Sequence, residues 1–121
     1  MYKYYLSANF LYLTGKSKLF CQMKIESFGE FIRSRREELH LPLRKVAAYL
    51  DIDTSTLSKI ERGERQTHQN YLRPLSEVLK IELKEIQTKF IAERIEIDFG
   101  ELEHLTLGLK AAEINLIRKK K

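Results

Sequence analysis

Five polar side chains between residues 54 and 62 are spaced so that one short helix would carry them on its outer side. They are Thr54, Ser55, Ser58, Lys59 and Arg62. Hydroxyl groups can donate to or accept from base edges, and a lysine ammonium can donate to guanine O6 and N7. A helix with such groups outward fits the major groove of B-DNA, where its N-terminal residues reach the bases. This segment is therefore a candidate reader of DNA sequence.

Basic side chains on either side of this segment are candidates for a second kind of contact. Lysine and arginine bound to phosphates position a protein on DNA and make binding depend on salt, but they carry no sequence information. The alternative for each is a solvated surface charge. The candidates are Arg44, Lys45, Arg62 and Arg65.

Two short helices joined by a tight turn must position these groups. Pro42 suits the start of the first helix. Asp53 suits the N-cap of the second, because its carboxylate can accept from free amide groups and meets the positive helix end. Gly63 stands where that helix needs a left-handed residue at its C-terminal end.

The apolar residues of the same stretch predict how the two helices pack. Ala47 is small because the second helix would cross close to it, and Ile52 would fill the turn beneath both. Leu57 and Ile60, three residues apart, would face inward from the second helix. Two helices joined in this way form a helix-turn-helix unit.

The run VAAYLDIDTSTLSKIERGER resembles the lambda-repressor-like, or Xre-type, helix-turn-helix family, and the resemblance covers residues 26–87. It implies an all-α fold with a five-helix DNA-binding domain, operator DNA as the ligand, and usually a dimer. It also implies that Arg36 and Glu61 form a buried ion pair. Leu43 stands where the family often has a phosphate-contacting Gln, and Pro42 where it often has Ser or Thr. A phosphate contact from the Leu43 side chain is therefore not carried over.

Local signals predict three more helices of the domain. Ser27 with Glu30 forms a capping box, and the helix that follows should end near Leu39. Thr67 is expected to cap a fourth helix that runs to about residue 80 and is bent or shortened by Pro74. A fifth helix should span residues 83–97 and break at residues 98–100.

A C-terminal helical extension is expected from about Glu101 to Arg118. Its apolar residues form a seam that can pack on the chain's own helices or pair two copies. A helix with two apolar rows needs two partners, which favours a homodimer. The seam is Leu102, Leu105, Leu109, Ala112 and Leu116, and the second row is Leu107, Ile114 and Ile117.

The first 22 residues differ in composition from the rest. They hold three lysines, no acid and six of the twelve aromatic residues. We expect Met23 to be the biological start and residues 1–22 to be a disordered leader or a misassigned start; a basic arm and a signal peptide are the alternatives. The expected domains are residues 1–22, a helix-turn-helix domain at 23–90, and an extension at 91–121 that is a candidate for dimerisation.

Several classes of protein are disfavoured. No uncharged apolar run approaches the roughly 18 residues that span a bilayer, and the single Cys21 points to a cytoplasmic protein. The three histidines are too scattered for a zinc helix, and Glu101-x-x-His104 is one half of a di-iron motif that has no second copy. We expect no enzyme, metal, cofactor or membrane association.

The sequence thus predicts a sequence-specific DNA-binding transcriptional regulator. It would be a repressor, an autoregulator or the controller type found beside restriction–modification genes, and would bind a palindromic double-stranded operator as a homodimer. Two alternatives stay open: the antitoxin of a toxin–antitoxin pair, whose partner is the toxin, or a protein-interaction scaffold that binds no DNA.

Overall fold

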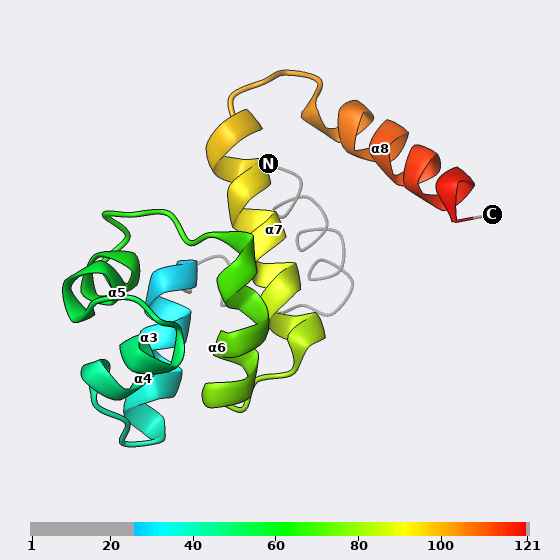
Figure 1. Cartoon of the computed structure of the whole chain (residues 1–121). Coiled ribbons are helices and arrows are strands. Elements are labelled where there is room, and N and C mark those ends of the chain that lie inside the picture. Colours follow the sequence, from blue (N-terminus) through cyan, green and yellow to red (C-terminus); the bar gives the residue numbers. More distant parts are fainter. Residues whose placement is uncertain (1–25, 121) are drawn as a thin grey trace, which may run out of the picture. The chain divides into compact units, whose positions relative to one another are not determined.

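The computed structural model describes residues 26–120, and all regular secondary structure in that range is helical. This confirms the predicted all-α class. The helices are α3 (Phe28–Glu38), α4 (Leu43–Tyr49), α5 (Thr54–Glu61), the 3-10 helix η1 (Gln69–Tyr71), α6 (Leu72–Val78), α7 (Leu83–Phe99) and α8 (Leu105–Lys119) (Figure 1).

The described residues fall into two compact units, and the boundary lies within α7. The first unit ends at Glu93 and holds α3 to α6 with most of α7; the second begins at Arg94 and holds α8. The first unit, called the body below, contains the first four predicted helices and most of the fifth. The predicted leader at residues 1–22, Met23 and Cys21 lie outside the described residues.

Helix ends in the body follow the capping chemistry of the sequence. The Ser27 hydroxyl accepts from the Glu30 amide at 3.1 Å and begins α3. Pro42 occupies the N-cap of α4, and Asp53 that of α5. Gly63 has φ +77 and directly follows the C-cap of α5. These predicted boundaries are confirmed.

The predicted cap at Thr67 is wrong. The chain instead forms η1, whose N-cap residue His68 accepts from the Asn70 amide through Nδ1 at 3.1 Å. The helix α6 then begins at Leu72. Pro74 is the third residue of α6, where an amide has no partner inside the helix. The proline therefore sets where the helix begins rather than bending it.

The last helix also begins later than predicted, at Leu105 instead of Glu101. The intervening residues form turns, in which the Leu102 amide donates to the Phe99 carbonyl and the Leu105 amide to the Leu102 carbonyl. Leu102 therefore lies outside α8, and the predicted seam loses its first member.

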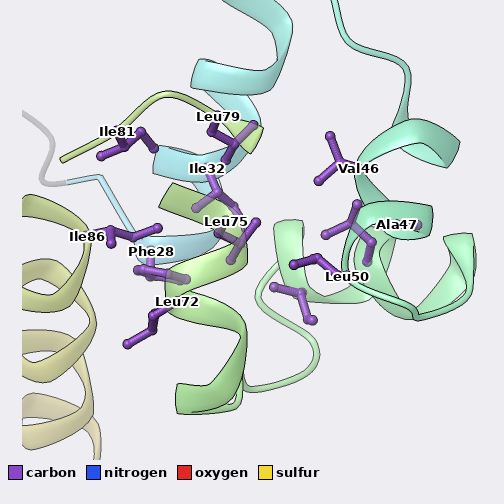
Figure 2. Packing of buried hydrophobic residues seen from close by; sticks show 12 residues of the cluster. Phe28, Ile32, Val46, Ala47, Leu50, Leu72, Leu75, Leu79, Ile81 and Ile86 are labelled. Atoms are coloured by element: carbon purple, nitrogen blue, oxygen red, sulfur yellow. The ribbon is translucent and has the colours of Figure 1, made fainter. Parts of the chain in front are cut away.

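A single apolar core holds the body together. Figure 2 shows side chains of α3, α4, α6 and the start of α7 converging on it. Burying each large aliphatic side chain contributes about 1.5–3 kcal/mol. The largest fully buried side chains are Ile32, Val46, Leu57, Leu75, Leu79 and Ile86.

Polar contacts between distant segments fix α3 within this body. The Phe28 amide at the start of α3 donates to Glu93 Oε1 on α7 at 3.0 Å, and the Phe28 and Phe90 rings pack edge to face. Near the other end of α3, Arg35 Nε donates to the carbonyl of Leu79 at 3.0 Å, just past the end of α6. Because α3 is held at both ends, it is a fixed platform for the helices that pack on it.

Candidate nucleic-acid interface

The inner face of α5 is anchored in the core. Leu57 and Ile60 are 0% and 3% exposed, and Ala47 on α4 is 1% exposed. The helix α5 packs against both α3 and α4, and Figure 1 shows these three helices as one group. The half-buried Ile52, in the turn between α4 and α5, packs against the same core. This packing leaves one face of α5 directed to solvent.

The residues on that outer face are the ones that the sequence singled out as base readers. Residues three or four apart share a face of a helix. Thr54, Ser55 and Lys59 are exposed, Ser58 is half-buried, and Arg62 is exposed at the C-cap. The structure thus places them on one surface of α5, available to a ligand in solution.

The proposed phosphate contacts come from two further segments. Arg44 and Lys45 are exposed in the first turn of α4, and Arg65 is exposed in the loop after α5. Arg62 forms an exposed ion pair with Glu64, Nε to Oε2 at 2.7 Å. An exposed pair of this kind is worth little and exchanges readily for another anion.

The N-terminal end of α5 carries a hydrogen-bonded acidic cap. Asp53 Oδ1 accepts from the Thr56 amide at 3.2 Å, and Ser55 Oγ lies 3.1 Å from Asp53 Oδ2. Hydrogen bonds from Thr56 and then from Ser55 lower the pKa of the Asp53 carboxyl below its ordinary value. The cap is therefore a carboxylate at neutral pH, placed at the end of the helix that would enter the groove.

A buried ion pair ties the other end of α5 to α3. Arg36 Nε lies 2.7 Å from Glu61 Oε1, and Arg36 Nη2 lies 3.0 Å from Oε2. The remaining guanidinium nitrogen, Nη1, donates to the Leu41 carbonyl at 2.9 Å, just before α4. The hydrogen bond with Glu61 raises the pKa of Arg36, and burial opposes this effect. One side chain thereby links all three helices of the group.

Gly29 is a positioning residue that the sequence interpretation missed. A Cβ at this site in α3 would lie 2.6 Å from the Glu61 carbonyl oxygen and would also collide with that of Ile60. The backbone of α3 therefore touches the C-terminal end of α5 directly. A glycine inside a helix, which costs about 1 kcal/mol relative to alanine, was the available signal.

Residues 26–120 contain no group of three or more His, Cys, Asp or Glu that could hold a metal ion. Among the described helices, none has the length and apolarity that crossing a membrane requires.

Comparison with known proteins identifies the domain. A family model described as helix-turn-helix matches residues 32–86, which run from α3 into α7. This segment belongs to the lambda-repressor-like helix-turn-helix family. The earlier resemblance is therefore confirmed, and the helix-turn-helix itself consists of α4, the turn at residues 50–53, and α5.

Curated relatives are similar to this chain over slightly less than half of its length. The HTH-type transcriptional repressor RghR of Bacillus subtilis (strain 168) is 38% identical over 58 residues, which are 47% of this chain and 43% of the relative. The uncharacterized HTH-type transcriptional regulator Rv0474 of Mycobacterium tuberculosis (strain ATCC 25618 / H37Rv) is 34% identical over 53 residues, 44% of this chain and 38% of the relative. The chain thus spans under half the length of these relatives. No solved structure matches it.

Proposed function

We propose that this chain is a sequence-specific DNA-binding transcriptional regulator of the cytoplasm, with α5 as its recognition helix. The observation that carries this proposal is the division of α5 into two faces. Leu57 and Ile60 fix the helix in the core, and the polar groups of Thr54, Ser55 and Lys59 face solvent. A rigidly held helix with donors and acceptors on its free side has the form needed to read base edges.

Roles within the interface follow from side-chain chemistry. Lys59 is assigned to guanine, since its ammonium donates to O6 and N7. Thr54, Ser55 and Ser58 are assigned to base edges near it. Phosphate contacts are assigned to Arg44, Lys45, Arg62 and Arg65. The logarithm of the DNA-binding constant should fall with the logarithm of the salt concentration, and each contact should steepen this slope by about 0.9.

Selection of bound DNA from a random double-stranded pool tests the proposal. We expect enrichment of one consensus, and loss of binding in the double variant Lys59→Ala/Ser55→Ala. The matched control is Lys84→Ala, which removes the same charge from an exposed site on α7 outside the proposed interface. If the double variant binds the consensus as tightly as the control does, α5 is not the recognition helix. No enrichment at all would favour the scaffold function without DNA binding.

We further propose that the chain acts as a homodimer through its second unit. No residue of α8 is buried, although the described part of this unit exposes many large apolar side chains. Large apolar side chains that gather on an exposed surface often mark a protein–protein contact. The exposed residues are Ile97, Phe99, Leu102, Leu107, Ile114, Leu116 and Ile117.

The charges of α8 favour a second copy in antiparallel orientation. Pairing two α8 helices about a point between Lys110 and Glu113 brings Lys110 of each copy beside Glu113 of the other. A parallel pair would instead place both basic runs, residues 118–121, at the same end. A two-fold dimer carries two copies of α5, and a palindromic operator requires two such copies about one DNA turn apart, roughly 34 Å.

Repression is the mode of action that we propose. One curated relative is named a transcriptional repressor, and a dimer that lies across an operator can exclude polymerase without any further contact. Light scattering of the full chain measures the mass. A monomer that binds DNA would contradict the dimer but not the recognition helix, and would point to another partner for α8, such as the toxin of an antitoxin pair.

A further inference from the structure

The hydroxyl of Ser55 has a fixed direction in this structure. An ionised carboxylate can accept hydrogen bonds but cannot donate them. Since Ser55 Oγ lies 3.1 Å from Asp53 Oδ2, the single hydroxyl proton must point at Asp53. The serine side chain therefore presents its oxygen lone pairs, and not its proton, to a ligand.

Asp53 itself is held in place by two different contacts. Its Oδ1 accepts from the Thr56 amide at 3.2 Å, and its negative charge meets the positive end of α5. The carboxylate is also fully exposed, so its remaining lone pairs face the same solvent as Ser55. The side chains of these two residues together form an edge at the N-terminal end of α5 that can only accept, called the acceptor edge below.

The major groove offers few groups that suit such an edge. Adenine presents the N6 amino group and cytosine the N4 amino group as donors, whereas guanine presents O6 and N7 and thymine presents O4 and a methyl group. A guanine or thymine opposite the acceptor edge would place its acceptor atoms against the oxygen atoms of Ser55 and Asp53, next to the negative charge of Asp53. This contact would be repulsive. An amino group there would form a charge-assisted hydrogen bond instead.

We propose that the acceptor edge of Asp53 and Ser55 makes the N-terminal turn of α5 select a base with an exocyclic amino group, adenine or cytosine. This inference rests on the proposed function, because it concerns what α5 reads once it is in the groove. Cytosine suits the edge better than adenine, whose N7 lone pair lies next to the N6 donor.

The selection is opposite to that of Lys59. Lys59 lies four residues after Ser55, slightly more than one helical turn or about 6 Å along α5, and its ammonium can only donate. Successive bases on one strand lie about 3.4 Å apart. The half-site should therefore combine a guanine under Lys59 with an adenine or cytosine one or two base pairs away, under the acceptor edge.

Selection from a random pool with three variants tests the inference. Ser55→Ala identifies the base position, since only that position should show a weaker preference. In the unmodified chain this position should favour adenine or cytosine over guanine and thymine by about tenfold, the range of one charge-assisted hydrogen bond. In Asp53→Asn the serine hydroxyl is free to turn and the amide adds a donor, so the preference should vanish or move to guanine or thymine.

Asp51→Asn is the matched control. Asp51 is exposed and has φ +58, a backbone conformation that asparagine tolerates well, so the control removes the same charge two residues earlier. It should keep the preference of the unmodified chain. Asparagine caps helices as well as aspartate, and equal circular dichroism of the two variants verifies that α5 is intact.

Three results would overturn the inference: guanine or thymine at the identified position, a preference that survives Asp53→Asn, or a Ser55→Ala variant that changes no position. Each of them would still leave an enriched consensus and hence the proposed function. A pool with no enriched sequence for the unmodified chain would contradict the proposed function itself.

Discussion

Arg36 and Glu61 are joined by two hydrogen bonds across 25 residues of sequence, at 2.7 and 3.0 Å, and their side chains are 14% and 6% exposed. The pair connects α3 to the last residue of α5. Because Arg36 also donates to the Leu41 carbonyl before α4, one guanidinium contacts both ends of the helix-turn-helix. The contribution of the Arg36–Glu61 pair to stability can be measured by replacing one of its two partners.

Glu61→Gln should lower the free energy of unfolding by about 3–5 kcal/mol, because it leaves the Arg36 charge buried without its counter-charge. Urea denaturation measures the change. The control is Glu37→Gln, which breaks the exposed pair Arg33–Glu37 and should cost at most about 0.5 kcal/mol. Equal losses in the two variants would show that the buried pair has no special role.

Two glycines in helices should respond to alanine in opposite ways. Gly29→Ala drives a methyl group into the Glu61 carbonyl and should lower both the melting temperature and DNA affinity by displacing α5. Gly108→Ala meets nothing within 4 Å and should stabilise α8 by about 1 kcal/mol. Thermal unfolding followed by circular dichroism compares them. A harmless Gly29→Ala would mean that α3 and α5 are not in backbone contact.

The acidic cap of α5 should make stability depend on pH in a defined direction. The folded state lowers the pKa of Asp53 below its ordinary 3.8, through hydrogen bonds from Thr56 and Ser55. The stabilisation that the ionised Asp53 gives to the folded state is therefore complete above pH 3.8. It is lost as the pH falls through the lower pKa that Asp53 has in the folded state. NMR titration of the Asp53 carboxyl carbon should show the lowered pKa, and Ser55→Ala should move it back towards 3.8. An unchanged titration in that variant would show that the serine does not donate.

The antiparallel dimer predicts a charge-reversal rescue. Lys110→Glu alone and Glu113→Lys alone each place like charges together in the paired helices and should weaken the dimer. The double variant Lys110→Glu/Glu113→Lys restores both cross-pairs and should recover the original dissociation constant, as measured by analytical ultracentrifugation. In a parallel dimer neither residue meets the other across the interface, so no rescue would be seen.

Features governed by neighbouring residues were predictable from the sequence. The caps at Ser27 and Asp53 and the left-handed Gly63 are confirmed, since each depends on the chemistry of three or four adjacent residues. The cap at Thr67 was mispredicted because a histidine ring nitrogen can also accept from an amide, and the next residue, His68, uses it. The outer face of α5 followed from helical spacing alone.

Features that join distant segments were not predictable. From the sequence alone, Gly29 is only a residue that destabilises α3. Its role is seen once the structure shows that the Glu61 carbonyl lies against it. The bond between Arg35 and the Leu79 carbonyl spans 44 residues. The sequence left open whether the Ser55 hydroxyl donates or accepts a hydrogen bond. Only the position of the Asp53 carboxylate shows that it donates.

The contact between the Phe28 amide and Glu93 has a consequence for synthesis of the chain. It spans 65 residues, from the first residue of α3 to the last residue of the body. A ribosome delivers Phe28 long before Glu93, and chains grow at about 5–20 residues per second. The start of α3 therefore waits several seconds for its partner, and the body cannot close until almost all of α7 has left the exit tunnel.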